Sequence, residues 1–544
     1  MASIKQATVA QLRGMAPASV IHGGVDSVQR ALAQLNSKDT PIEKYIYLSQ
    51  LRGTAKDTFY RLLIDNIIDI CPYVYTPTVG AACQLYSTIY RKPDALYLSY
   101  NDRGNLAEIM SNWPQHGIRI AVVSDGSRIL GLGDLGIGGC QIAVGKLTLY
   151  VGGAGIKPDS TLPIILDMGT NNETLLNDPL YLGLRMKRVY DDAFLDEFYA
   201  AVRTTFPDCL IQFEDFSSES AFKYLDRYRH KESLIQAPSA PSGQLHTGKC
   251  FNDDIQGTGA VILAGFINAV KLASAASGRP ILDQRIVFLG AGSAGVGVAM
   301  QLVEFFTRNG FTEEEAKQKF YLVDSKGLVT DDRGDNLPAH KRALSRKAGG
   351  PQFKTLEEVV EHVRPSALIG LSTVGGAFSE KIVRMMGSFK ARPIIFPLSN
   401  PSHLSECTFE DAIKWTNGRV IFASGSPFKA VEHGGSTYES NQGNNFLSFP
   451  GIGLGCIVAK ANEVNDDMVY ESALALADSL DDSEINTLLY PRLHRIRDIS
   501  ATIAARVAKA AVRTGAAENS KLGGMADTDL LAYIKSKQYD PTPC

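Results

Sequence analysis

The spacing of hydrophobic positions changes twice along the chain and divides it into three parts. Up to about Lys92, apolar residues follow helical spacing, as in Pro41-Ile-Glu-Lys-Tyr-Ile-Tyr-Leu and Phe59-Tyr-Arg-Leu-Leu-Ile. From Ala95 the apolar residues form short continuous runs, each followed by polar or glycine-rich residues. Beyond about Asp466 helical spacing returns, with an alanine-rich run over residues 499–512. The pattern predicts helices at both ends of the chain and buried strands between them.

The short apolar runs fall into two series. The first comprises residues 118–123, 164–166 and 210–213, and the second residues 286–289, 321–323, 367–371, 394–397 and 420–423. Strands without polar alternation, separated by helical stretches, are typical of parallel sheets covered on both faces. We therefore predict an α/β fold with an N-terminal helical domain, a parallel-sheet substrate domain and a Rossmann-type doubly wound NAD(P)-binding domain. The expected bounds are 1–93 for the helical domain, 94–252 for the substrate domain, completed by 445–516, 253–444 for the NAD(P)-binding domain, and 517–544 for a C-terminal extension.

Composition narrows the functional classes. The chain has 544 residues, 44% hydrophobic and 21% charged, as in an ordinary soluble enzyme of several domains. The formal net charge of -3 provides no basic field for nucleic acid or anionic lipid, so neither is an expected partner. Eight cysteines without a CxxC pair indicate buried free thiols. The most apolar stretch, Ile255 to Val270, contains polar residues and predicts a buried helix.

The pattern GxGxxG occurs twice. Gly131-Leu-Gly-Asp-Leu-Gly136 leads into more glycine, which favours a tight loop. Gly290-Ala-Gly-Ser-Ala-Gly295 directly follows a predicted strand and opens a predicted helix. Only the second context lets backbone N–H groups and a helix N-terminus face a pyrophosphate. The cofactor-binding residues expected there are Gly290, Gly292, Ser293, Ala294 and Gly295.

The next predicted strand ends at Asp324, where an acid would bind the ribose hydroxyls of NAD. Ser325 and Lys326 follow it, and Lys341 comes later. A 2′-phosphate needs such donors and cations, although a solvated basic loop has the same composition.

Two acidic pairs stand at the ends of predicted elements. Glu214-Asp215 ends a strand between two phenylalanines, and Asp253-Asp254 precedes the predicted buried helix. Each pair alone is commonly a helix cap or a surface acid. Together they offer enough oxygen ligands for octahedral Mg²⁺ or Mn²⁺.

Lys146 and Tyr75 are the remaining candidates for chemistry. Lys146 lies inside the apolar run Ala-Val-Gly-Lys-Leu, where a lysine either snorkels to solvent or has a depressed pKa. Taken alone, snorkelling is the ordinary interpretation. Tyr75, in Val-Tyr-Thr-Pro-Thr-Val-Gly, is by default a packing residue with a locally bonded hydroxyl.

Taken together, these segments closely resemble malic enzymes. The matching stretches run in family order from about residue 40 to about residue 450. They are Tyr75-Thr-Pro-Thr-Val-Gly, Arg128-Ile-Leu-Gly-Leu-Gly-Asp-Leu-Gly, Val144-Gly-Lys-Leu, Phe213-Glu-Asp-Phe, Phe251-Asn-Asp-Asp-Ile-Gln-Gly-Thr, the Gly290 loop, Leu398-Ser-Asn-Pro and Gly443-Asn-Asn.

The resemblance implies oxidative decarboxylation of L-malate to pyruvate with NADP, NAD being possible, and Mg²⁺ or Mn²⁺. It implies Lys146 as general base, Tyr75 as general acid and Asp253 as an auxiliary acid. It also implies that Arg128, Asn400 and Asn445 bind substrate, with Asn400 near the cofactor as well. Glu214, Asp215 and Asp254 would hold the metal, while Ser325, Lys326 and Lys341 look like the NADP-preferring branch.

The resemblance also implies a homodimer or homotetramer. Some animal members bind an activating dicarboxylate through an arginine whose aligned position here is Thr54, which puts that control in doubt. Residues up to Val25 include Lys5 and Arg13 but no acid, which is compatible with a transit peptide or a short leader. Because the segment from Gln11 resembles the beginning of the mature family fold, we expect a cytoplasmic location, with the mitochondrial matrix as the alternative.

Two other functions remain open. A non-decarboxylating dehydrogenase of similar architecture, acting on a hydroxy or amino acid, would need no metal-binding carboxylates. A non-catalytic dinucleotide-binding protein would be expected to lose the candidate lysine, tyrosine and acids first.

Overall fold

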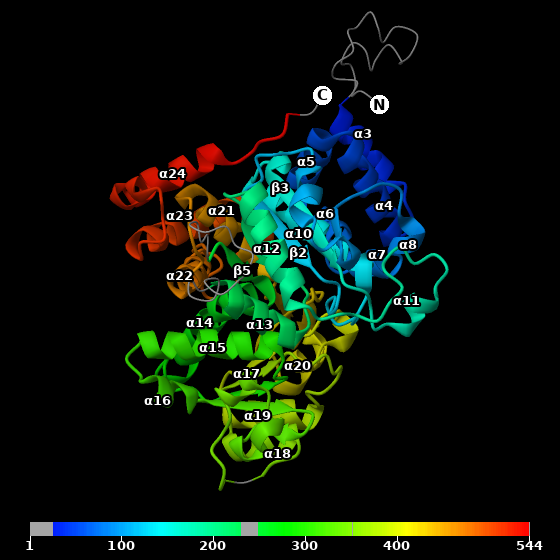
Figure 1. Ribbon diagram of the computed structural model, residues 1–544. Coiled ribbons are helices and arrows are strands. Elements are labelled where there is room, and N and C mark those ends of the chain that lie inside the picture. The colour runs from blue at the N-terminus through cyan, green and yellow to red at the C-terminus, as the bar shows by residue number, and fades with distance from the viewer. Residues whose placement is uncertain (1–25, 230–247, 351, 543–544) are drawn as a thin grey trace, which may run out of the picture.

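The computed structural model describes residues 26–229, 248–350 and 352–542 (Figure 1). Residues 1–25, which are compatible with a transit peptide or a short leader, lie outside the described residues. The N-terminal part consists of short helices, as the hydrophobic spacing predicts. They are α3 (Ser27–Asn36), α4 (Pro41–Thr54), α5 (Lys56–Asp65), α6 (Ile67–Val74), α7 (Thr78–Gln84) and α8 (Tyr86–Ile89).

Local sequence explains two of these helix boundaries. Thr40 and Glu43 form a reciprocal capping box at the start of α4, with Pro41 at its first position. Asn66 interrupts the apolar helical pattern, because its backbone is not helical and its side chain donates to the Leu62 carbonyl. α6 therefore begins as a separate helix after Asn66, and Tyr75 is its C-cap.

The first sheet has the order β1-β3-β2-β4-β5, and all its pairings are parallel. Its strands are β1 (Leu96–Ser99), β2 (Ile120–Ser124), β3 (Thr161–Asp167), β4 (Leu210–Phe213) and β5 (Cys250–Asn252). Ile120 and Val122 belong to the same apolar core as α10 (Cys140–Ala154), whereas Ala121 and Val123 pack in a second core with α9 (Leu106–Ser111) and α12 (Asp192–Thr205). Alternate residues of β2 thus face helices on opposite sides, which explains its continuous apolar run.

The second sheet has the order β14-β11-β10-β9-β6-β7-β8. Its pairings are parallel except for β8, which runs antiparallel to β7. The strands are β6 (Ile286–Leu289), β7 (Phe320–Asp324), β8 (Gly327–Leu328), β9 (Ala367–Gly370), β10 (Ile394–Pro397), β11 (Ile421–Ser424) and β14 (Asn441–Gln442). The chain winds outward from β6 in both directions, which confirms the predicted doubly wound sheet.

Helices cover both faces of this second sheet. One layer contains α14 (Thr258–Ser277) and α15 (Ser293–Arg308), and the other contains α18 (Leu356–Val363), α19 (Glu380–Phe389) and α20 (Phe409–Thr416). The smaller helices and strands at the surface are α11 (Glu173–Asn177), α13 (Ser218–Arg229), α16 (Glu313–Lys317), α17 (Ala339–Arg342), β12 (Val431–His433) and β13 (Ser436–Tyr438).

The C-terminal helices return to the first sheet. α21 (Phe449–Ala459) and α23 (Ile496–Arg513) pack on α10, α22 (Asp466–Ala477) packs on α14, and α24 (Asp527–Lys537) packs on α23. Figure 1 shows them beside the first sheet, away from the second sheet at the bottom of the view. Because α10 is enclosed by helices from both ends of the chain, every one of its residues is buried.

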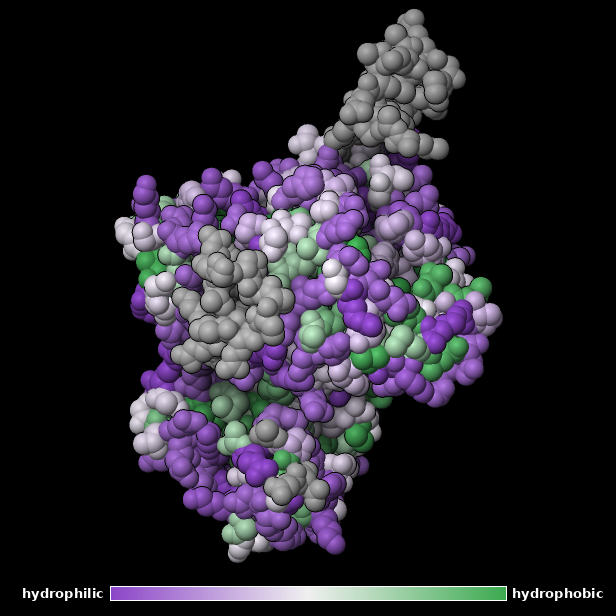
Figure 2. All heavy atoms as spheres, in the orientation of Figure 1, coloured by the Kyte–Doolittle hydropathy of each residue, from purple (hydrophilic) through white to green (hydrophobic). Residues whose placement is uncertain are grey.

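One described helical stretch, 253–277, is long and apolar enough to cross a membrane by length and composition. Within its most apolar window 67% is buried inside the protein, and α14 packs against α15 and α22. This is the buried helix that the sequence predicts over 255–270. The face in Figure 2 is largely hydrophilic, with apolar side chains gathered near α11, where Leu180 and Leu182 are exposed. All seven cysteines of the described residues are buried and free, as predicted.

Candidate active site

One cavity of about 170 Å³ lies where the carboxyl ends of the two sheets face each other. Parallel strands place the residues that follow them at one edge, so short segments from distant parts of the chain converge there. The cavity is lined by ten of the residues expected from the sequence, namely Tyr75, Arg128, Glu214, Asp215, Asp254, Gly292, Ser293, Ala294, Asn400 and Asn445.

Three carboxylates form an acid cluster, defined here as Glu214, Asp215 and Asp254. The first two directly follow β4, and Asp254 follows the paired strand β5 in a short π-helix, Asp253–Gly257. One oxygen from each of the three lies within 4.8 Å of the others. The Asp215 N–H donates to Asp254 Oδ2 at 2.8 Å, while Asp215 Oδ2 is buried without a hydrogen-bond partner among the described residues.

The electrostatics of the acid cluster suit a hard cation. Burial raises the pKa of all three carboxyl groups, and repulsion from neighbouring carboxylates raises the pKa of Glu214 and Asp215 further. A divalent cation would relieve both effects and would take the unpaired Asp215 oxygen as a ligand. Carboxylate oxygens in this number and proximity fit Mg²⁺ or Mn²⁺.

Lys146 lies behind the acid cluster on α10, and its side chain is fully buried. Its Nζ lies 2.9 Å from Glu214 Oε1 and donates a hydrogen bond to Asp253 Oδ2. The snorkelling interpretation is therefore wrong, because the helices around α10 leave the side chain no route to solvent. The ammonium also lies 4.6 Å from the Phe449 ring centroid and 5.4 Å from that of Tyr75.

The expected depression of the Lys146 pKa is also wrong for this state of the site. Burial lowers the pKa, but the carboxylates of Asp253 and Glu214 outweigh it and raise the pKa well above its usual value. The sequence showed the apolar surroundings of this lysine along its own helix. It did not show two carboxylates arriving from other elements.

Tyr75 and Asn445 complete the surroundings of Lys146. Tyr75 caps α6 and is buried, and burial raises the pKa of its hydroxyl although Lys146 opposes the change. Asn445 Nδ2 donates to Asp253 Oδ2 at 2.5 Å. Asp253 itself is fully buried, and a Cβ at Gly257 would lie only 1.7 Å from its Oδ1. Glycine at that position is what admits the carboxylate.

Arg128 and Asn400 face the cavity from different sheets. Arg128 is exposed, its N–H donates to the Asp215 carbonyl at 3.2 Å, and its guanidinium makes no ion pair with a described carboxylate. Asn400 accepts a hydrogen bond from Ser426 Oγ at 2.5 Å. A Cβ at Gly131 would lie 2.5 Å from the Asn400 carbonyl oxygen. The first GxGxxG segment is therefore a tight loop against the second sheet, as predicted.

The second GxGxxG segment has the geometry of a dinucleotide loop. Gly290 has φ +109°, which only glycine adopts readily, and a Cβ there would meet the Leu371 carbonyl. A Cβ at Gly295 would meet the Gly290 carbonyl at 2.2 Å, so glycine lets α15 start close to the turn. Gly292 leaves its side open to the cavity. These are the three roles that a pyrophosphate loop requires.

At the end of the neighbouring strand β7, a second charged group contains Asp324, Arg333 and Lys341; we call it the Asp324 group. Arg333 Nη1 lies 2.9 Å from both Asp324 oxygens, and Lys341 Nζ lies 2.9 Å from Oδ2. Despite the opposing effect of burial, these cations lower the Asp324 pKa. Ser325 and Lys326 are exposed beside it, with the Lys326 N–H donating to Asp324 Oδ1. Arg333 was not predicted, because it stands in an ordinary polar loop.

Strained backbone is concentrated at the cavity. Six described residues other than glycine have positive φ. Three of them, Arg364, Asn417 and Lys460, are helix C-caps, where this conformation is common. The other three line the cavity: Leu130, Asp215 and Thr373. Their common location marks the cavity as a functional site independently of any motif.

Comparisons with known proteins agree with this geometry. Residues 52–229 match the family "Malic enzyme, N-terminal domain", and residues 255–512 match "Malic enzyme, NAD binding domain". The chain is 45% identical to an NADP-dependent malic enzyme of Dictyostelium discoideum, covering 98% of this chain and 94% of that protein. It is 42% identical to a chloroplastic NADP-dependent malic enzyme of Zea mays, covering 97% and 80%.

A solved structure supports the fold. The crystal structure of Entamoeba histolytica malic enzyme aligns with a TM-score of 0.59 at 24% identity, covering 99% of this chain and 92% of that one. Two matching domains over most of the chain, and more than 40% identity over nearly its whole length, show that this chain belongs to the malic enzyme family.

Proposed function

We propose that this chain oxidises L-malate with NADP⁺ and decarboxylates the product, giving pyruvate, CO₂ and NADPH. The observation that carries the proposal is the joining of the acid cluster and the Gly290 loop in one cavity, with Lys146 and Tyr75 beside the cluster. The relatives named NADP-dependent malic enzyme support the same reaction.

Substrate binding falls to groups that are free to meet carboxylates. The exposed guanidinium of Arg128 suits a planar malate carboxylate, which it can bind through two parallel hydrogen bonds. Asn400 and Asn445 also line the cavity, and their amides are the other proposed substrate-binding groups. Loss of these groups would raise the KM for malate more than the KM for cofactor.

Lys146 is the proposed general base. It accepts the C2 hydroxyl proton while C2 loses hydride to the cofactor, and for this it must be neutral. Burial favours the neutral amine, and the carboxylates of Glu214 and Asp253 oppose it. Any neutralisation of Glu214 therefore lowers the Lys146 pKa toward that required of a base. Tyr75, whose hydroxyl remains protonated by a wide margin, is the proposed acid that protonates C3 after CO₂ leaves.

The acid cluster is the proposed metal site. Mg²⁺ or Mn²⁺ bound there would supply Lewis-acid polarisation of the substrate's C2 oxygen and positive charge beside the developing enolate. Glu214 is shared between this site and Lys146, so it links metal binding to the protonation of the base.

NADP is the proposed cofactor. The Gly290 loop and the N-terminus of α15 would receive the pyrophosphate. In the Asp324 group, two cations surround one carboxylate, and Lys326 adds a third cation nearby. This excess of positive charge favours a 2′-phosphate over a second ribose hydroxyl.

A malate-driven assay separates this function from that of a non-decarboxylating dehydrogenase. We expect NADPH and CO₂ to form in equal amounts, only with Mn²⁺ or Mg²⁺, and NAD⁺ to be the poorer oxidant. NADPH formation without CO₂ would favour the plain dehydrogenase. Cofactor binding by calorimetry without turnover would favour a non-catalytic protein.

We further propose a homodimer or homotetramer. Large hydrophobic side chains are exposed in the N-terminal helical part, among them Ile68, Leu85 and Tyr90, and a subunit interface there would cover them. Light scattering coupled to gel filtration measures the mass directly, and a monomer across the micromolar range would refute the proposal. The cytoplasmic location stays a prediction.

A further inference from the structure

The loop that carries Arg128 has unusual support at both ends. We call residues 125–136 the substrate loop; it follows β2 and contains the first GxGxxG segment. Arg128 stands near its beginning with an exposed side chain that no described carboxylate pairs with. Leu130, two positions later, has φ +49°. A loop with a free guanidinium and a strained backbone needs anchors elsewhere to hold one conformation.

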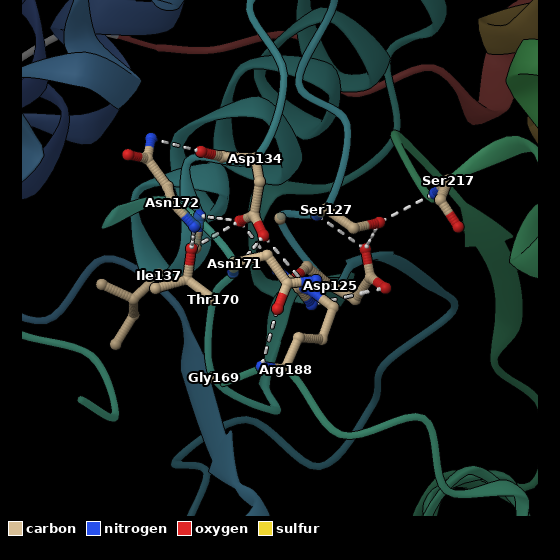
Figure 3. Close-up of polar contacts among 12 residues, drawn as sticks. Asp125, Ser127, Asp134, Ile137, Gly169, Thr170, Asn171, Asn172, Arg188 and Ser217 are labelled. Atoms are coloured by element: carbon tan, nitrogen blue, oxygen red, sulfur yellow. Dashed lines mark hydrogen bonds and ion pairs between the residues drawn. The ribbon is translucent and has the colours of Figure 1, made fainter. Parts of the chain in front are cut away.

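Arg188 supplies these anchors from a distant segment. It follows α11 in the chain, its side chain is fully buried, and its guanidinium reaches both ends of the substrate loop (Figure 3). Nη1 donates to the Asp125 carbonyl at 2.8 Å and lies 3.6 Å from Asp125 Oδ2. Nη2 donates to Asp134 Oδ1 at 2.9 Å, and Nε donates to Asp134 Oδ2 at 3.3 Å. One guanidinium therefore fixes the distance between the two ends.

Hydrogen bonds from Asp125 connect this end of the substrate loop to a neighbouring segment. Asp125 Oδ1 accepts hydrogen bonds from the N–H and hydroxyl of Ser127, and Ser127 Oγ accepts one from the Ser217 N–H at 2.8 Å. Ser127 immediately precedes Arg128, and Ser217 stands two positions after Asp215 of the acid cluster. Figure 3 shows the contact between Ser127 and Ser217, through which the network connects the backbone beside Arg128 to the backbone beside the proposed metal site.

The other end of the substrate loop, at Asp134, is also held by several hydrogen bonds. Asp134 accepts hydrogen bonds from the Gly136 N–H, the Thr170 hydroxyl and the Asn171 N–H, at 2.8–3.0 Å. Asn172 Nδ2 donates to the Asp134 carbonyl at 2.8 Å. Every one of these bonds lies outside the cavity, so the network can act on substrate only through the loop.

We propose that Arg188 is a positioning residue: it holds the substrate loop so that the Arg128 guanidinium meets the malate carboxylate. The proposal rests on the proposed malate-oxidising function and deepens it. It also gives the first GxGxxG segment a role, since the same anchored loop brings Gly131 against the Asn400 carbonyl. Arg188 touches no substrate; its effect passes through the position of Arg128.

The test compares Arg188→Lys, Asp134→Asn and Arg188→Ala with the wild type. Lysine keeps the positive charge but lacks the forked guanidinium that bonds to both Asp125 and Asp134. We expect the KM for malate to rise about tenfold or more, because small misplacements of a binding group are costly. The KM for NADP⁺ should stay within about twofold, since the Gly290 loop is untouched. Guanidinium at a non-denaturing concentration should partly restore the malate KM of Arg188→Ala, and sodium chloride at equal ionic strength should not.

Arg203→Lys is the matched control. Arg203 belongs to α12 beside the same sheet, has the same 7% exposure as Arg188, and packs on the Tyr199 ring instead of the substrate loop. Its variant should keep the malate KM even if thermal stability falls. Equal increases in the KM for malate and for NADP⁺, or a malate KM unchanged in all three test variants, would overturn the positioning role. If Arg188→Ala does not fold, the two milder variants decide the question. Wild-type protein without malate turnover would overturn the proposed function itself, and this role with it.

Discussion

The acid cluster and the Asp324 group are two charged sites at the edges of the sheets, and they differ in their contact with water. Glu214 and Asp215 are buried, and Lys146 beside them is fully enclosed. Asp324, Arg333 and Lys341 keep between 12% and 18% of their side-chain surface exposed. In the acid cluster, burial raises the carboxyl pKa values; in the Asp324 group, two cations hold the Asp324 pKa low.

The difference matches the two tasks. A site that performs proton transfer and metal binding benefits from excluding water, because charge changes there have large energetic effects. A site that only distinguishes a phosphate from a hydroxyl needs a favourable charge balance, and partial hydration lets it release the cofactor. We therefore expect substitutions in the first region to act strongly and with little dependence on salt. Those in the second should act weakly and respond to salt.

The largest expected effect is that of Lys146→Ala. Losing a general base typically costs 10²–10⁴ in rate, and here Glu214 and Asp253 would also lose their buried counter-charge. Malate oxidation should fall by at least that factor, while NADPH binding, followed by its fluorescence, stays nearly unchanged. Lys381→Ala, which removes a lysine of α19 whose side chain is 67% exposed and which does not line the cavity, is the control. Activity within about threefold of wild type would assign the base to another residue.

The next effect should be that of Asp254→Asn. The substitution keeps the side-chain size and its contact with the Asp215 N–H but removes one anionic ligand. Charge is what a hard cation needs from its ligands, so the half-saturating Mn²⁺ concentration should rise by about tenfold or more. An unchanged Mn²⁺ requirement would leave Asp254 as a helix cap only.

The stabilisation of the protein by Mn²⁺ should depend on pH, because the acid cluster must release protons to bind the cation. Since the carboxyl pKa values are raised in the folded protein, the metal-free fold binds more protons than the unfolded chain and loses stability as pH rises. A cation must displace those protons, so its affinity increases by up to about tenfold per pH unit for each proton released. The gain in Tm on adding Mn²⁺ should therefore be larger at about pH 8 than at about pH 6. Equal gains at both values would contradict this prediction.

The same contrast separates what could be predicted from the sequence. Strands such as β2 and β4 were predictable, because burial on both faces leaves a continuous apolar run. β5, with three residues, is too short to give such a signal, and the exposed hairpin β12–β13 has no apolar pattern to detect. Motif residues at strand ends were predictable because parallel sheets gather them at one edge.

The surroundings of the motif residues were not predictable. The neighbours of Lys146, among them Glu214, Asp253 and Phe449, come from distant parts of the chain, so its own helix showed only that it lies among apolar residues. Arg188 and Arg333 stand in polar loops of ordinary composition, and only the fold brings each to its carboxylates. Long-range pairing of charges leaves no local trace in one sequence.

The smallest effect, and the one that tests the second region, concerns Lys341→Ala. In this variant Arg333 would still pair with the Asp324 carboxylate. The substitution would therefore remove only one charge-assisted contact to the 2′-phosphate. Such a contact is worth about 1.5–3 kcal/mol when enclosed and about 0–1 when exposed. A tenfold change in affinity corresponds to ~1.4 kcal/mol. Because Lys341 is only partly exposed, we expect the KM for NADP⁺ to rise several-fold and the KM for NAD⁺ to stay almost unchanged. Raising salt from about 50 to about 300 mM should shrink the difference between variant and wild type, as screening weakens the contact in the wild type.

Lys326→Ala provides the exposed reference and should show a smaller change with stronger salt dependence. If both cofactors lose affinity equally, Lys341 supports the loop or the shared pyrophosphate. Cofactor choice then rests on Ser325 and Lys326, and the Asp324 group is structural.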